Sequence, residues 1–307
     1  MHSETPPAPR KCSPAAAAHR PPDWPKFAGA AGALTAGFVF PLSALAQFAL
    51  KSEFHSYIVL MPFIAGYFAW QDREEIPGGA RAGWWPLLPL LAGAGLLTVY
   101  CATFHADPPL VYEDALALIV GTYYTFLLAA AGWTLGTAAC RRLAFPFGLL
   151  ALMIPVPLRL LDAFEGGLRY ASGWAAYLLL KVSGTGVQIK GLTLTLHGAP
   201  PLAVAAECSG IHSTMVLIIS SLVMGRLFLK DPRRRWVLVL LTLPLGALRN
   251  GLRIWMLGEL CVHYDPKILD TWVHHRSGPF FFVLSLGALY WIMRRLQRGE
   301  RAQAAPR

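Results

Sequence analysis

Eight mostly apolar runs recur along the 307-residue chain and constrain its fold more than any other sequence feature, although the second, fifth and eighth runs are short. A membrane-spanning helix needs about 20 mostly apolar residues, because its backbone must satisfy its own hydrogen bonds inside the lipid. The runs therefore predict an all-α polytopic membrane protein with about eight transmembrane helices. The expected spans cover residues 28–50, 55–71, 84–103, 114–139, 143–158, 207–229, 236–260 and 277–293.

Composition supports a membrane environment. Hydrophobic residues make up 55% of the chain and charged residues only 14%, whereas soluble globular proteins contain about 25% charged residues. Basic cytoplasmic loops explain the net charge of +10, so we expect contact with membrane lipid and no nucleic-acid partner. The five cysteines show no Cys-x-x-Cys pair and no zinc-ligand spacing, so we expect no disulfide scaffold, metal or cofactor.

The distribution of lysine and arginine predicts the orientation in the membrane. Basic residues concentrate in the N-terminal tail, in the loop over residues 230–235 and in the C-terminal tail, and such clusters stay on the cytoplasmic side. We therefore expect a multi-pass protein of the inner (cytoplasmic) membrane with both termini in the cytoplasm. Its parts would be a disordered tail over 1–27, a membrane domain over 28–293 and a basic tail over 294–307.

Residues 159–206 form the longest segment expected outside the membrane, and we expect them to cap a site on the extracytoplasmic face. Their first part, 159–185, places charged residues among apolar ones, which is typical of an amphipathic helix on or partly within the membrane. A ninth span there would leave a basic cluster on the wrong side. Residues 187–196 alternate apolar and polar side chains before a turn at 198–201, which predicts a short β-ribbon. This ribbon is either a packed linker or an edge that an extended peptide joins.

Three separated groups of chemically capable residues are expected to meet at the outer membrane boundary. The first is Cys208 at the start of an expected span, because a thiol at a helix N-terminus lies in a positive potential that favours the thiolate. The small residues Ser209 and Gly210 would let a substrate backbone approach it. The other groups are Arg249, Asn250 and Arg253 in the seventh expected span, and His274, Ser277 and Gly278 near the start of the eighth.

Arg253 admits several interpretations, because an arginine inside a membrane is costly and faces a polar cavity or a partner. It serves a substrate, or it forms a structural pair with Glu207 or Glu259. Arg253 and Asn250 also fit a transporter for an anionic solute, although we find no internal repeat or matched broken helices. A third interpretation is an assembly scaffold for envelope export. Unlike a thiol enzyme, both of these alternatives would tolerate the loss of Cys208.

Two histidines compete for the role of general base. His212 lies four residues after Cys208, one helical turn later, whereas His274 belongs to the third group. A metal site built on Cys208 and His212 is a weak hypothesis, because two ligands do not define one. Cys101 and Cys140 lie in or next to apolar spans, where a cysteine is usually an inert packing residue.

At these positions the chain resembles the exosortase/archaeosortase family, polytopic cysteine transpeptidases or proteases of the cell envelope. The resemblance rests on three motifs in order: Ala206-Glu207-Cys208-Ser209-Gly210, Asn250-Gly251-Leu252-Arg253-Ile254, and His274 four residues before Gly278. It extends to His55-Ser56-Tyr57, Phe145-Pro146 and Ile154-Pro155-Val156-Pro157, and it covers most of residues 50–290.

The resemblance implies that Cys208 is the nucleophile, Arg253 the oxyanion or substrate stabiliser and His274 the acid/base. It implies exported protein substrates with a PEP-CTERM-like C-terminal sorting signal, made of a short motif, a membrane helix and a basic tail. Cleavage would pass through a thioester and would require no metal or cofactor. Supporting or substrate-binding positions would be Glu207, Ser209, Gly210, His212, Arg249, Asn250, Ser277 and Gly278.

The chain departs from the family pattern at two positions. Glu207 directly precedes the cysteine where Ala is commoner, and an adjacent carboxylate disfavours a thiolate unless Arg253 pairs with it. His212 stands where many members have Arg, which leaves the choice between His212 and His274 as the base open.

Overall fold

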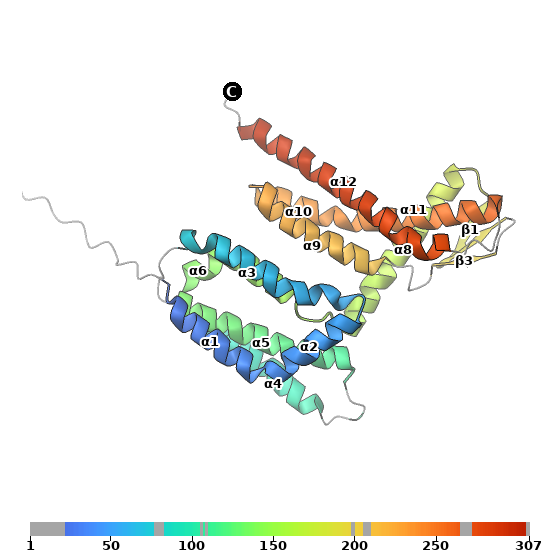
Figure 1. Ribbon diagram of the computed structural model, residues 1–307. Helices are drawn as coiled ribbons and strands as arrows, with labels where there is room; N and C mark the ends of the chain where they lie inside the picture. Colours follow the sequence, from blue (N-terminus) through green and yellow to red (C-terminus); the bar gives the residue numbers. More distant parts are fainter. Residues whose placement is uncertain are drawn as a thin grey trace, which may run out of the picture. The chain divides into compact units, whose positions relative to one another are not determined.

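The computed structural model describes residues 22–76, 83–104, 107, 110–197, 200–204, 210–264 and 272–304, with the backbone alone at 75, 272–277 and 304 (Figure 1). Most of the described residues lie in helices, in agreement with the predicted all-α class. Contacts divide the chain into two compact units. Unit 1 comprises residues 1–52 and 58–155, and unit 2 comprises residues 53–57 and 156–307.

Unit 1 is a helical bundle centred on α5. Its helices are α1 (Trp24–Gly37), α2 (Val39–Lys51), α3 (Met61–Asp72), α4 (Leu87–Phe104), α5 (Tyr112–Leu135), α6 (Thr137–Arg142) and α7 (Ala144–Ala151), with the 3-10 turn η2 (Arg73–Glu75). Of the 3-10 turn η1 (His55–Leu60), residues 58–60 belong to unit 1 and residues 55–57 to unit 2. α5 packs against α1, α2 and α4, and α3 packs against α7. The apolar window of α5 is 56% buried against 6% for α4, so α5 forms the centre and α4 an outer edge of this unit.

The first expected span, 28–50, is broken in the middle. α1 and α2 meet at a bend of 73°, so the prediction of one continuous helix is wrong. The sequence contains the cause, because Pro41 lacks the backbone N–H that would bond to the Gly37 carbonyl and its ring clashes with that carbonyl. Phe38, between the two helices, accordingly leaves helical geometry at φ −104° and ψ 17°.

Two other expected spans contain short helices. α3 has 12 residues and α7 has 8, whereas crossing the hydrocarbon layer takes about 20. α7 ends at Ala151 and is followed by Pro155 and Pro157, and a residue that precedes proline avoids helical geometry. Full spans over 55–71 and 143–158 are therefore not confirmed.

Unit 2 contains the helices α8 (Leu158–Val182), α9 (Ile211–Phe228), α10 (Pro232–Leu240), α11 (Thr242–His263) and α12 (Trp272–Ala304). α9, α11 and α12 contact one another, and α8 makes extensive contact with α11 (Figure 1). At Gly251 in α11 a β-carbon would lie 2.6 Å from the β-carbon of Ala175 and 3.2 Å from the Ser172 carbonyl oxygen. α8 and α11 therefore approach each other as closely as a glycine allows.

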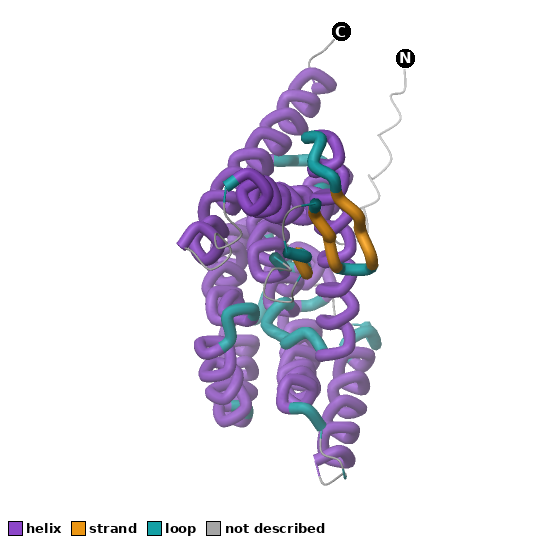
Figure 2. The backbone as a smooth tube through the Cα atoms, turned by 90° about the vertical axis from the view of Figure 1, so that its right-hand side faces the viewer, coloured by secondary structure: helices purple, strands orange, loops and turns teal. Residues whose placement is uncertain are grey.

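The predicted β-ribbon is present as a small antiparallel sheet in unit 2 (Figure 2). Its strands are β1 (Val187–Lys190), β2 (Thr193–Leu196) and β3 (Leu202–Ala203), in the order β1-β2-β3. One face packs on α8 and α11 through a core cluster of Ala176, Leu180, Leu194, Leu196, Val204 and Ile254. The alternation of apolar and polar residues along β2 supplies the buried face of this sheet.

The chain has a polytopic membrane architecture. In the described ranges, five helices are long and apolar enough to cross a membrane, or six if the bent α1–α2 pair is one span. The five are Leu87–Phe104, Tyr112–Leu135, Ile211–Phe228, Pro232–His263 and Gly278–Gln303. The predicted number of eight is not confirmed. α8 is one continuous helix of 25 residues outside this set, in agreement with the amphipathic helix predicted there.

Candidate active site

Unit 2 contains a cavity of about 350 Å³ whose wall collects residues from all three predicted groups. They are Gly210, His212, Arg249, Asn250, Arg253 and Gly278. These residues come from α9 or its cap, α11 and α12, three helices in mutual contact (Figure 1). The cavity therefore combines a helix N-terminus, two guanidinium groups, an imidazole and an amide.

Gly210 caps the N-terminus of α9 in a left-handed conformation, with φ 66°. Its carbonyl oxygen accepts hydrogen bonds from the Thr214 backbone N–H at 3.0 Å, from Thr214 Oγ1 at 2.9 Å and from Arg249 Nη2 at 3.0 Å. A β-carbon at this position would collide with the same Arg249 nitrogen. Backbone conformation and available space thus both select glycine here.

Arg249 and Asn250 are buried in α11, with 6% and 2% of their surface exposed. Arg249 Nη2 is bound to Gly210, while Nη1 has no hydrogen-bond partner among the residues that the structure describes. Arg253 lies one turn further along α11 and lines the same cavity. Two guanidinium groups that line one cavity favour a negative charge that develops there.

The residues that directly precede Gly210 lie outside the described part of the chain. Among them are the predicted site residues Glu207, Cys208 and Ser209. The described chain stops at Val204 and resumes at Gly210 on the cavity wall. Cys208 is two peptide units from that wall along the chain, and each unit spans about 3.8 Å between Cα atoms.

The third predicted group lies at the start of α12. This helix begins at Trp272, before the expected start at residue 277, so His274 and Ser277 lie in its first turns, where the backbone alone is described. Gly278 lines the cavity. Positions 274 and 278 are four residues apart and share one face of the helix.

The family model described as Transmembrane exosortase matches residues 49–291. The chain belongs to the transmembrane exosortase family. No curated protein and no solved structure matches the chain. The match to the exosortase model includes every residue of the cavity wall described above. Exosortases are membrane proteases and transpeptidases, so this chain is a multi-pass member of that class.

The sequence prediction omits five residues of the cavity wall: Glu53, Phe54, Ile211, Ser213 and Phe281. Glu53 and Phe54 belong to the short segment 53–57, which is part of unit 2 although it is far away in the sequence. A signal was available, because His55 follows directly and belongs to the family resemblance. His55 is 3% exposed and meets the Phe54 ring edge-on, with the ring centroids 4.7 Å apart.

Glu259, one of the two predicted partners of Arg253, is bound on the side of α8. Its Oε1 accepts hydrogen bonds from Ser183 and, at 2.8 Å, from Thr185. Its Oε2 lies 3.3 Å from His263 Nδ1. These contacts tie α11 to the end of α8 and give the Glu259 carboxylate a structural role.

Cys140 has the surroundings of an unreactive thiol. It is half-buried in α6, and burial raises the pKa of the Cys140 thiol to about 11. A thiol with such a pKa stays protonated at neutral pH and is a poor nucleophile. Cys140 is therefore a suitable control for experiments on Cys208.

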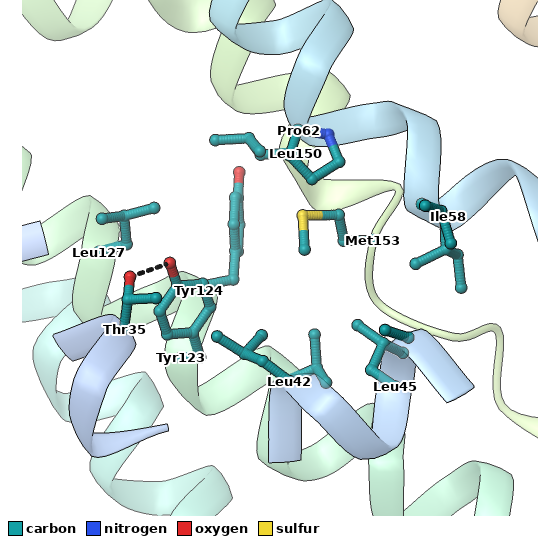
Figure 3. Close-up of a pocket in the computed structure, with 13 residues that line it drawn as sticks. Thr35, Leu42, Leu45, Ile58, Pro62, Tyr123, Tyr124, Leu127, Leu150 and Met153 are labelled. Atoms are coloured by element: carbon teal, nitrogen blue, oxygen red, sulfur yellow. Dashed lines mark hydrogen bonds between the residues drawn. The ribbon is translucent and has the colours of Figure 1, made fainter. Parts of the chain in front are cut away.

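A second cavity of about 350 Å³, in unit 1, has a different character (Figure 3). It lies beside the α1–α2 bend, and most of its lining residues are apolar, such as Leu42, Ile58 and Met153. Its lining hydroxyls bond within the protein. Thr35 Oγ1 lies 3.1 Å from the Tyr123 hydroxyl, and the Tyr124 hydroxyl donates to the Phe147 carbonyl at 3.0 Å. This lining offers no nucleophile or base, so the cavity in unit 2 is the candidate active site.

Proposed function

We propose that this exosortase is a membrane-embedded cysteine transpeptidase or protease that cleaves the C-terminal sorting signal of exported proteins. The observation that carries the proposal is the cavity in unit 2, where Gly210, Arg253 and Gly278 of three separate motifs line one wall. Membership of the exosortase family supports the reaction class. The substrate would carry a short motif, a membrane helix and a basic tail.

Cys208 is the proposed nucleophile. Its thiolate attacks the carbonyl carbon of the scissile peptide bond, and collapse of the tetrahedral intermediate breaks the C–N bond and leaves a thioester. An amine or water then attacks the thioester carbonyl and releases the thiolate. Cys208 precedes the N-terminus of α9 by a few residues, and the positive end of that helix favours a thiolate nearby.

Arg253 is the proposed stabiliser of the oxyanion. The oxygen of the attacked carbonyl becomes negative in the tetrahedral intermediate, and a guanidinium that lines the cavity stabilises that charge. Arg249 lies one turn away and adds a second positive charge to the same wall. Asn250 between them is almost fully buried.

His274 is the proposed acid and base. Its imidazolium would protonate the leaving amine, and the neutral ring would then activate the acceptor nucleophile. Its position one turn before Gly278 in α12 supports the choice. His212 also lines the cavity and is the alternative base.

The proposed site faces the extracytoplasmic side of the inner membrane, and both chain termini face the cytoplasm. Basic residues at the α9–α10 connection and along the end of α12 support this orientation. A substrate with one membrane helix would then present its cleavage point just outside the lipid.

A thioester-trapping experiment tests the proposal. Purified enzyme is incubated with a sorting-signal substrate in the absence of an added amine, and the peptide that contains Cys208 is analysed by mass spectrometry. We expect an acyl adduct on Cys208 in the wild type and no cleavage by Cys208→Ala. Cys140→Ala should cleave normally. Full processing by purified Cys208→Ala would refute thiol catalysis and favour a transporter or an export assembly factor.

A further inference from the structure

The five residues 205–209, which include Cys208, are flanked by two carbonyl groups that are each held by an arginine. On one flank, the Val204 carbonyl oxygen accepts hydrogen bonds from Arg169 Nε at 3.0 Å and Nη2 at 2.8 Å. On the other flank, the Gly210 carbonyl accepts one from Arg249 Nη2 at 3.0 Å. Hydrogen bonds from charged donors are about twice as strong as neutral ones, so both carbonyls are firmly held.

The N–H, the carbonyl and the side chain of Val204 are each held by other residues. Its N–H donates to the Leu192 carbonyl at 2.9 Å, beside the β2–β3 pairing. Its side chain is 2% exposed and belongs to the core cluster under the sheet. Arg169 fixes the remaining carbonyl. Because a peptide unit is planar, the orientation of this carbonyl sets the direction in which the chain continues beyond Val204.

The two arginines belong to two helices that pack tightly against each other. Arg169 belongs to α8 and Arg249 to α11, and these helices meet tightly where Gly251 faces Ala175. A shift of one arginine relative to the other would require this helix contact to open. Both ends of the connection are therefore held against the same pair of helices.

We propose that Arg169 is a positioning residue for catalysis, which acts with Arg249 to place the segment that carries Cys208. This inference rests on the proposed role of Cys208 as the nucleophile. Attack on a peptide carbonyl requires the reacting atoms to be held close together and aligned, and a misplacement of about 1 Å can lower the rate about 100-fold. Arg169 need not touch the substrate to have such an effect.

A purely structural role for Arg169 makes a different prediction. The sheet is already held by β1–β2–β3 pairing and by its apolar core. If Arg169 only added stability, its loss would lower the folded fraction and leave the turnover of each folded molecule unchanged. If it positions the segment, kcat falls while KM, which depends mainly on the rest of the bound substrate, changes little.

The test compares Arg169→Gln, Arg169→Lys and Arg159→Gln in full-length purified enzyme, with kcat and KM measured on a sorting-signal substrate and the thermal midpoint measured in parallel. Arg159 is an exposed arginine of the same helix and gives the matched control. We expect Arg169→Gln to lower kcat about 10- to 100-fold with KM within about twofold of wild type. Arg169→Lys should recover part of kcat, because an ammonium keeps a charged donor but not the planar fork. Arg159→Gln should match the wild type.

A double variant distinguishes joint placement of the segment by Arg169 and Arg249, which we call the clamp, from two independent effects of the two arginines. If both arginines hold one segment, Arg169→Gln combined with Arg249→Gln should lower kcat little more than the worse single variant, because residues that act as a unit are not additive. A loss equal to the product of the two single losses would contradict the clamp.

Other outcomes overturn the inference in distinct ways. Turnover of Arg169→Gln within about twofold of wild type would refute it, as would an equal loss in Arg159→Gln. If Arg169→Gln does not accumulate, Arg169→Lys carries the test, and an unchanged kcat in that variant refutes the inference. Cys208→Ala is run alongside: activity in that variant refutes the proposed function itself, whereas an inactive Cys208→Ala with a normal Arg169→Gln refutes only the clamp.

Discussion

Gly210 has a left-handed backbone, and its carbonyl accepts three hydrogen bonds, one of them from the buried guanidinium of Arg249. A β-carbon there would strain the backbone by about 1–2 kcal/mol and push Arg249 out of its place. Because Arg249 also holds the chain that follows Cys208, the effect should reach the reaction as well as the fold.

We therefore expect Gly210→Ala to lower the free energy of unfolding by about 1–3 kcal/mol and to lower kcat more strongly than that loss of folded protein explains. Thermal unfolding in detergent and steady-state kinetics on the same preparation measure both quantities. Gly287→Ala in α12 is the matched control, because a β-carbon there meets no atom within 4 Å. Wild-type kinetics in Gly210→Ala would show that the cap does not shape the site.

Substitution of each of the two candidate bases, His274 and His212, should affect processing differently. His274→Ala should abolish processing, because removal of the acid and base leaves the amine without a proton donor. His212→Ala should lower the rate only modestly, as expected for a residue that lines the cavity without transferring a proton. Rates measured across a pH series for both variants test this assignment. An inactive His212→Ala variant together with normal activity of His274→Ala would make His212 the base.

At the scale of helices and strands, continuous apolar runs were predicted well and interruptions were not. α4, α5 and α9 begin and end within a few residues of the expected spans, because an uninterrupted apolar run of that length has one stable form in lipid. The break in α1–α2 depends on Pro41 and the one after α7 on Pro155 and Pro157, and the effect of a few prolines disappears when hydropathy is averaged over a window. The site shows a similar division. The chemistry of Arg249 and Arg253 was visible in the sequence, whereas Glu53 reaches the cavity through a tertiary contact, and its sequence signal is its place two residues before His55.

The α8–α11 contact yields a prediction at this scale. The atoms that a β-carbon at Gly251 would meet include the Ala176 backbone nitrogen at 3.1 Å and the Ser172 carbonyl at 3.2 Å, and backbone atoms cannot move aside as a side-chain end can. We expect Gly251→Ala to lower the free energy of unfolding by about 1–3 kcal/mol, read from thermal unfolding beside Gly287→Ala. A midpoint at or above that of the wild type would show that the two helices separate easily.

For the whole molecule, the orientation in the membrane is testable on the span that α10 and α11 form together. Pro232–His263 is 32 residues long and should place its two ends on opposite sides. In a cysteine-free background, a cysteine at Tyr264 should react with a membrane-impermeant thiol reagent in intact cells, and one at Arg233 should react only after permeabilisation, because the basic cluster stays in the cytoplasm. Both positions are exposed, so access within the protein does not bias the result. The opposite labelling pattern would invert the proposed topology.

The two anchored carbonyls that flank residues 205–209 also bear on which sequence changes this exosortase can accept. A connection fixed at Val204 and at Gly210 must cover a set distance, so apart from Cys208 its composition can vary more readily than its number of residues. Insertion or deletion of a single residue between the anchors would move Cys208 by one residue relative to Val204 or relative to α9, depending on the side of Cys208 on which it falls. The same insertion in an exposed surface loop would be absorbed by the solvent-facing chain. The number of residues in this connection and the place of Cys208 within it are thus the properties that natural variation and protein engineering must preserve.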